Sequence, residues 1–366
     1  MKEVRLIFLA FALLAVLFAG GCARTPNPGP VEGGVISFQA GVELVREESS
    51  TKALNEATSF TNGQTFRVFG RRTGEGQNTR IFYRDDSEDP MENYQSVAVT
   101  KTDDVWTYSP PIYWYWVSER NYYDFIAVYP DDAPAVRMMD ESVPPKDIPG
   151  NMAIKSEYNI ASDTHDLLMA ATRRVGLALD RTAPVELTFN HMLCAVKVVV
   201  SNESTSESLT LNELSLNNII QSAYAKMTID SKGEPEYYWI DSRRNETKVI
   251  LFTGTETVLA DGDYATSFKL LIPGDLTDTI DGSSDEDKMP HLNVVIDGFS
   301  SEDIPPIPLK DIQRSRYTTE DPITVWEPGI RYTYHIIVRL DGGVRVTVVT
   351  TEWDEIEAET PGLLIE

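Results

Sequence analysis

Strict alternation of apolar and polar residues is the feature of this sequence that most constrains its fold. In residues 35–45 one phase of the alternation holds only apolar residues: Ile36, Phe38, Ala40, Val42 and Leu44. Successive side chains of a β-strand point to opposite faces, so a period of two predicts a strand buried on one side. Patterns with the 3.6-residue period of a helix are scarce. We therefore expect an all-β chain.

Similar runs recur along the chain, with turn residues between them. One begins at 66, and the others are 106–108, 112–116, 123–129, 268–272, 292–296, 330–340 and 344–349. Asp341-Gly342-Gly343 lies between the last two runs and predicts a β-hairpin. Many short strands separated by turns are typical of β-sandwiches.

A second series of alternating residues begins near Pro184. It has two phases, one set by Val185, Leu187 and Phe189 and the other by Val196, Val198 and Val200. A β-bulge near residues 193–195 would reconcile the two phases.

The length of 366 residues leaves room for two cores. We place the boundary around residues 181–184, which gives two β-sandwich domains in series, 35–183 and 184–366. Phe189, Leu193 and Val198 are expected in the core of the second sandwich.

The first 22 residues have the layout of a lipoprotein signal. Lys2 and Arg5 precede an unbroken apolar run over 6–19, which ends in Gly20-Gly21-Cys22. About 20 apolar residues are needed to span a bilayer, and this run is shorter. We expect 1–21 to be a cleaved signal peptide and Cys22 to carry the lipid that attaches the chain to the outer membrane. An ordinary secretory signal with an incidental cysteine is the alternative. We expect residues 22–34, which are rich in Pro and Gly, to form a tether.

The negative charge of the chain disfavours anionic partners. The formal net charge is −25, and such a chain repels nucleic acid and anionic lipid. The basic pairs Arg71-Arg72, Arg173-Arg174 and Arg243-Arg244 are interpreted as solvated strand ends or turns. Cys194 lies in an apolar run and is interpreted as a small buried hydrophobe.

The sequence offers little chemistry for an enzyme. Its four histidines, His165, His191, His291 and His335, form no metalloprotease motif, and no nucleophile elbow or phosphate-binding glycine loop is present. Within strand patterns, His191 and His335 are interpreted as structural. The acidic stretch 275–287 matches no EF-hand spacing and is interpreted as a solvated loop. We expect no enzymatic activity, no cofactor and no metal; a hydrolase is disfavoured because no nucleophile–base pair can be named.

An aromatic segment is the strongest candidate for a ligand site. Tyr113-Trp114-Tyr115-Trp116 is followed by Tyr122 and Tyr123. Such rings can stack on sugars, so a stand-alone surface protein that binds glycans is the alternative function. In a strand, however, Trp114 and Trp116 share one face, and buried aromatic residues dominate core energetics. Core packing is therefore the favoured interpretation.

The order of several short motifs resembles the fimbrillin-like lipoproteins of Bacteroidetes, the subunits of type V pili. The N-terminal motifs are 36–40, 51–53, 66–70, 106–108, 113–114, 123–130 (YDFIAVYP) and 166–170 (DLLMA). The C-terminal motifs are 187–193 (LTFNHML), 271–273, 326–329 (WEPG), Tyr332, Tyr334 and Trp353. The resemblance spans nearly the whole chain after the signal.

This resemblance implies two transthyretin-like β-sandwich domains and a structural or adhesive role in a cell-surface fimbria, at its tip, anchor or shaft. It implies partners of two kinds, other fimbrial subunits joined by donor-strand exchange and a host or bacterial receptor. The sequence departs from the pattern at its end. Few residues follow Trp353, and residues 354–359 include four acids, so a long apolar donor strand is not evident.

The resemblance also implies that a protease cuts many subunits after an arginine behind the first strand. Arg46 follows the alternating run closely, and the polar residues from Glu47 onward would offer exposed backbone. A cut between Arg46 and Glu47 would release the first strand and also the lipid, so a permanent anchor should escape it. The alternative is that Arg46 is a solvated charge at a strand end.

Overall fold

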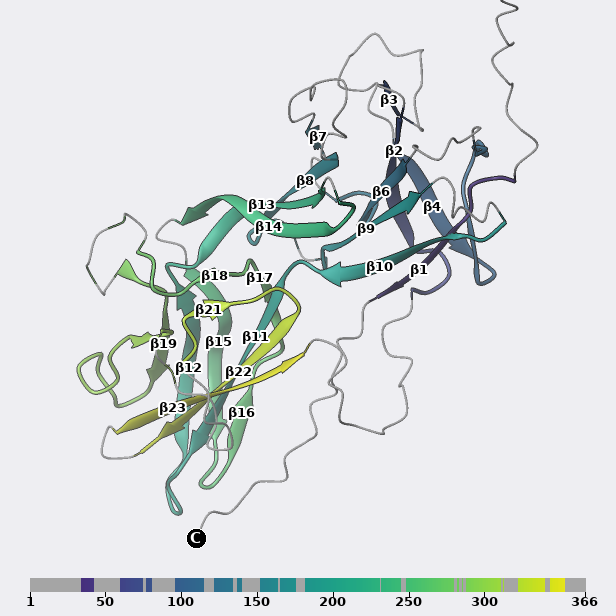
Figure 1. The fold of residues 1–366 in the computed structure, drawn as a ribbon. Helices are drawn as coiled ribbons and strands as arrows, with labels where there is room; N and C mark the ends of the chain where they lie inside the picture. The colour runs from purple at the N-terminus through teal and green to yellow at the C-terminus, as the bar shows by residue number, and fades with distance from the viewer. Residues whose placement is uncertain are drawn as a thin grey trace, which may run out of the picture.

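The computed structural model describes residues 34–42, 60–74, 77–80, 96–114, 122–133, 137–139, 152–163, 165–175, 182–230, 232–244, 248–279, 282, 285, 288–310, 312, 322–339 and 343–352. Every regular element in these ranges is a β-strand (Figure 1), and the expected all-β class is confirmed. In this part of the chain no helix is long and apolar enough to cross a membrane.

Eight strands form the N-terminal sheet. Their order is β1 (Phe38–Val42), β10 (Val185–His191), β9 (Leu168–Val175), β6 (Tyr122–Tyr129), β2 (Thr65–Gly74), β4 (Val97–Thr102) and β5 (Val105–Thr107), with β3 (Gln77–Arg80) paired to β2. The pair β1–β10 is parallel. All other pairs in this sheet are antiparallel.

This sheet is apolar on both faces. On one face the buried side chains, among them Phe66, Phe125 and Phe189, form a cluster that we call the first core. On the other face Phe69, Ile126 and Met169 belong to a larger cluster, the second core. Residues of the first core and of the second core alternate along the strands, because successive side chains of a strand point to opposite faces.

A long hairpin covers the second face of the N-terminal sheet. It consists of β13 (Ile220–Ile229) and β14 (Pro235–Arg244), and β13 pairs on its other side with β8 (Met152–Asn159), which pairs with β7 (Arg137–Met139). Ile154 of β8 and Met227 of β13 lie in the second core with Phe69. The hairpin therefore lies between the N-terminal sheet and the C-terminal sandwich, as Figure 1 shows.

Two further sheets form the C-terminal sandwich. The five-stranded sheet contains β16 (Asp263–Ala265), β11 (Cys194–Asn202), β22 (Ile330–Val338), β23 (Val344–Glu352) and, beside β11, β17 (Lys269–Leu271). The four-stranded sheet contains β15 (Lys248–Val258), β12 (Leu209–Asn217), β19 (His291–Ile296) and β20 (Ile307–Pro308). β18 (Gly274–Asp275) and β21 (Val325–Trp326) form a small two-stranded sheet. The predicted hairpin is confirmed, because β22 and β23 pair antiparallel over their whole length.

Two predictions about residues 185–200 are wrong. Phe189 packs in the first core with Phe60 and Phe66, whereas Leu193 and Val198 lie in the second core as expected. No bulge joins the two phases, because β10 and β11 belong to different sheets. The change of phase marks the point where the chain crosses from one sheet to the other.

Candidate functional site

The first strand lies at an edge of the N-terminal sheet. β1 pairs with β10 in parallel, from Phe38 opposite Val185 to Val42 opposite Phe189. Residues just before β1 contact a second segment, since the Ile36 amide donates to the Ile112 carbonyl at 2.8 Å. Parallel neighbours are not joined by a tight turn, so tertiary contacts hold β1 in place.

Alternate side chains of this segment, from Ile36 to Ala40, face the first core. Ile36 and Phe38 are buried and Ala40 packs against the same core, as the alternation predicts. The Phe38 ring lies 5.7 Å from the rings of both Tyr108 and Phe125. The Tyr108 hydroxyl donates to the Ile36 carbonyl at 2.5 Å. Burial raises the pKa of Tyr108, so this hydroxyl stays a donor.

Beneath the β1 segment the first core is rich in aromatic rings. Phe60 lies 5.1 Å from Phe189, Phe66 lies 5.2 Å from Phe189, and Trp114 lies 5.0 Å from Tyr123, all in edge-to-face geometry. Such geometry is one of the preferred arrangements of paired rings. Without β1, part of this apolar cluster would lose its cover.

The aromatic segment around residue 114 is mainly part of this core. Trp114 and Tyr123 are fully buried, whereas Tyr113 is 46% exposed. The favoured interpretation, in which one face of the segment packs inward, is thus confirmed for Tyr113 and Trp114. Because Trp114 and Tyr123 are buried, neither ring is available to stack on a sugar. Tyr115 and Trp116 lie outside the described residues.

A buried ion cluster crosses the other face of the N-terminal sheet. Asp124 on β6 lies opposite Arg71 on β2 and opposite Arg173 on β9. Arg173 Nε donates to Asp124 Oδ1 at 2.6 Å, and Arg71 donates to Oδ2 at 2.9 Å. The Asp124 side chain is 0% exposed, and those of Arg71 and Arg173 are 11% and 5% exposed. The interpretation of Arg71 and Arg173 as solvated charges is therefore wrong.

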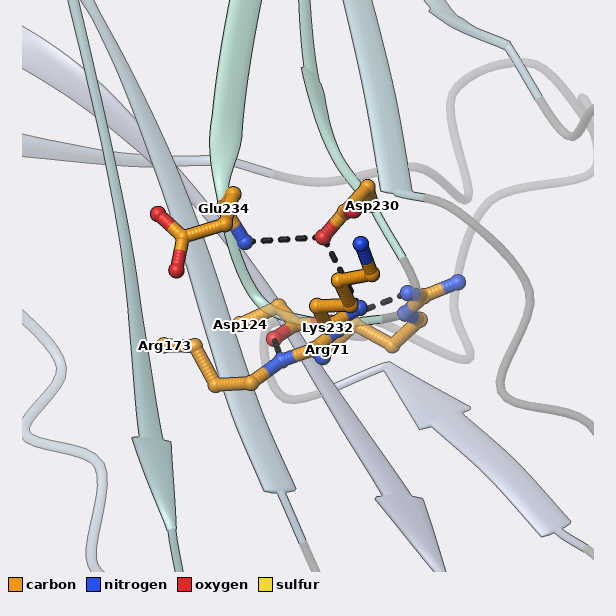
Figure 2. Close-up of polar contacts among 6 residues, drawn as sticks. All are labelled: Arg71, Asp124, Arg173, Asp230, Lys232 and Glu234. Atoms are coloured by element: carbon orange, nitrogen blue, oxygen red, sulfur yellow. Dashed lines mark hydrogen bonds and ion pairs between the residues drawn. The ribbon is translucent and has the colours of Figure 1, made fainter.

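The turn of the β13–β14 hairpin lies on this cluster, as Figure 2 shows. Asp230 Oδ1 organises the turn by accepting hydrogen bonds from the amides of Lys232 and Glu234, both at 2.8 Å. Gly233 has φ +96°, and a Cβ there would lie 2.7 Å from Cδ of Arg173. Only glycine both adopts this positive φ readily and leaves room for the Arg173 side chain. Burial alone would lower the pKa of Arg173, but its hydrogen bonds and ion pair with Asp124 raise it overall.

The histidines have contacts that suit structural roles. His191 Nδ1 lies 2.6 Å from Asp166 Oδ2 at the crossing between the sheets. His291 Nδ1 lies 2.9 Å from the Met289 carbonyl, and the His165 ring lies edge-on to Tyr158 at 5.6 Å. His335 lies on β22 opposite Thr347.

Cys194 and the described part of the acidic stretch have contacts that suit structural roles. The Cys194 thiol is fully buried and donates to the Leu271 carbonyl at 3.5 Å, and burial raises its pKa. In the acidic stretch, Asp275 accepts from the amide and hydroxyl of Thr277, both at 2.7 Å. Within the described ranges, no group of three or more His, Cys, Asp or Glu side chains could hold a metal ion.

Three of the sequence motifs meet where the chain crosses between the sheets. The Met192 amide donates to the Leu167 carbonyl at 2.9 Å, and the Gly329 amide donates to the Leu193 carbonyl at 2.8 Å. Trp239 of the hairpin donates from Nε1 to the Met192 carbonyl at 2.9 Å. The motifs at 166–170, 187–193 and 326–329 thus fix one junction, although they are far apart in the sequence.

The sequence profile of the fimbrillin-like family matches residues 51–353. The chain belongs to the fimbrillin-like family. This fimbrillin-like chain matches no curated protein.

Several solved structures are similar to this fimbrillin-like chain. A putative cell adhesion protein from Bacteroides uniformis shares 14% identity over 87% of this chain and 99% of its own, with a TM-score of 0.45. One from Parabacteroides distasonis shares 9% identity over 87% and 100%, with a TM-score of 0.44. The tip fimbrial protein Mfa3 from Porphyromonas gingivalis shares 10% identity over 80% and 95%, with a TM-score of 0.37. All three TM-scores are below 0.5, so the family assignment rests on the sequence match.

The predicted modification sites of the fimbrillin-like chain, Cys22, Arg46 and Glu47, lie outside the described residues. The ion cluster, in contrast, was missed by the sequence reasoning. A signal for it was present, because Arg71 is in phase with Phe69, and Asp124 is in phase with Ile126. A charged residue in phase with the core residues of its strand faces the core, and two such residues of opposite charge indicate a buried ion pair.

Proposed function

We propose that this chain is a structural subunit of a cell-surface fimbria, without enzymatic activity, and that a strand of a neighbouring subunit replaces β1. The observation that carries the proposal is the position of β1. It is a five-residue edge strand, parallel to β10, and its inward side chains cover an aromatic core. A strand from another subunit could offer the same backbone hydrogen bonds and alternating side chains.

Removal of β1 would create a site suited to such a strand. It would expose apolar surface near Phe125 and Tyr108 together with the free edge of β10. Unpaired strand edges readily pair with another chain. Because β1 ends at Val42, a cut between Arg46 and Glu47 would leave the whole strand on the released fragment.

Processing at Arg46 gives a direct test. We expect that the chain recovered from assembled fimbriae begins at Glu47, and that Arg46→Ala keeps β1 attached and abolishes incorporation. Lys52→Ala changes a nearby basic residue and serves as the control, with incorporation unchanged. N-terminal sequencing and fimbrial fractionation provide the readouts. An incorporated chain that begins at lipidated Cys22 would contradict the exchange of β1.

Attachment to the outer membrane is a separate part of the proposal. We expect Cys22→Ser to remove acylation of the uncut chain and to move the uncut chain from the membrane fraction to the soluble fraction, because the short apolar run gives no second anchor. Cys194→Ser, at a buried thiol, is the matched control and should leave acylation unchanged. Lipid and membrane association that persist in Cys22→Ser would refute the assignment.

A further inference from the structure

The second strand of the long hairpin, β14, lies at an edge of its sheet. Within the described residues β14 pairs only with β13, so the opposite edge of this ten-residue strand is unpaired there. Successive side chains point to opposite faces of a strand. Tyr237 is 44% exposed and Tyr238 is 41% exposed, so both faces of β14 are open at this point. Unpaired strand edges readily pair with another chain.

A bulge in β14 brings its acidic start and its basic end onto one face. Ile240 lies opposite Tyr224, and Arg243 lies opposite Ser222. Three steps along β14 therefore match two steps along β13, and the extra residue keeps Arg243 in phase with Ile240. The side chains of this phase form what we call the β14 face: Glu236, Tyr238, Ile240 and Arg243.

The charges of the β14 face are complementary to those of a second, antiparallel copy. Glu236 lies near the start of β14 and Arg243 near its end, and both are exposed. In an antiparallel pair of identical strands, the start of one strand lies beside the end of the other. A two-fold axis at Trp239 places Glu236 of each copy opposite Arg243 of the other. The same axis places Tyr238 opposite Ile240. Pairs of opposite charge and pairs of an aromatic with a β-branched residue both stabilise neighbouring strands.

We propose that two copies of this chain pair along β14 in antiparallel orientation, with Glu236 of each copy in an ion pair with Arg243 of the other. The pairing joins the two hairpin sheets into one continuous sheet, on which Tyr238 and Ile240 meet. The Tyr238 ring is already positioned on its own sheet, because Lys226 Nζ lies 5.4 Å from the ring centroid. The contact uses neither β1 nor β10, so it does not depend on the proposed replacement of β1.

The symmetry of this contact decides what it can assemble. The same surface is used on both copies, so the interface closes as a dimer and cannot extend a fibre. Under the proposed function it would hold two fimbriae side by side. One strand pair buries less surface than the roughly 1,200–2,000 Å² of a stable interface, so the dimer is weak for free chains. It strengthens where chains are held close together on a membrane or a fimbria.

Disulfide trapping tests the register. One preparation carries Tyr238→Cys and the other Ile240→Cys, both in the full chain with Cys22→Ser, in which Cys194 is buried. Opposite residues of an antiparallel pair have Cα atoms about 4.5–5.5 Å apart, within the range of a disulfide. We expect the mixture to form a disulfide-linked dimer under mild oxidation. As the control, Tyr238→Cys mixed with Ile250→Cys, at a 42% exposed residue of β15, should not link. Equal linking in both mixtures, or none in either, would overturn the proposal.

Charge reversal shows whether the ion pairs hold the dimer. Glu236→Arg places an arginine opposite Arg243, and Arg243→Glu places a glutamate opposite Glu236. Each variant alone should therefore associate about tenfold more weakly than the parent chain. An equimolar mixture of the two variants restores both pairs of opposite charge and should associate as the parent does. Sedimentation over a series of concentrations measures the association. A mixture that associates no better than either variant alone would contradict the pairing, as would two variants that associate like the parent.

Discussion

Asp124→Asn should lower the free energy of unfolding by about 3–5 kcal/mol. The change removes the negative charge between Arg71 and Arg173, whose side chains are 11% and 5% exposed. Two guanidiniums would then remain buried beside a neutral amide, and the desolvation of each would no longer be offset. Denaturant unfolding of the purified chain measures the effect.

Two variants separate this explanation from a general sensitivity to mutation. Asp104 pairs with Lys101 at 3.4 Å, but its side chain is 84% exposed, so Asp104→Asn should cost less than about 1 kcal/mol. Replacing all three charges by Arg71→Met, Asp124→Leu and Arg173→Met should recover much of the lost stability, because no buried charge is left unpaired. Similar losses in Asp124→Asn and Asp104→Asn would show that the cluster has no special role.

The second large effect is expected at Phe189. Phe189→Ala should destabilise the chain by about 3–5 kcal/mol, because truncation of a buried phenylalanine leaves a cavity. The ring is fully buried and contacts Phe60 and Phe66. Since Phe189 lies opposite Val42, the variant should also loosen β1.

Amide hydrogen exchange shows which core depends on this ring. Protection should fall first in β1, β2 and β10, and later in β11 and β22 of the C-terminal sandwich. Tyr113→Ala truncates a ring that is 46% exposed in the same part of the fold and serves as the control, with an effect below about 1 kcal/mol. If Phe189→Ala loses protection first in β11 and β22, Phe189 stabilises the second core and the prediction is wrong.

The two wrong predictions about residues 185–200 have a common cause. The alternation of Val185, Leu187 and Phe189 identifies an inward face, but it is equally compatible with either core. The phase change before Val196 could be a bulge or a crossing between sheets, and both give the same local pattern. Only the pairing partners of the strands distinguish a bulge from a crossing. β10 pairs with β1 and β9, whereas β11 pairs with β22.

The sequence alone determined the all-β class and the inward faces of many strands, because the period of two follows from backbone geometry within each strand. It also determined the hairpin of β22 and β23, whose turn residues are local. Only the tertiary structure decided that β1 lies beside β10 and that Asp124 joins Arg71 to Arg173. These partners are about 50 to 150 residues apart in the sequence. No local rule selects such partners, since they are chosen by the burial of side chains from distant strands on a shared core.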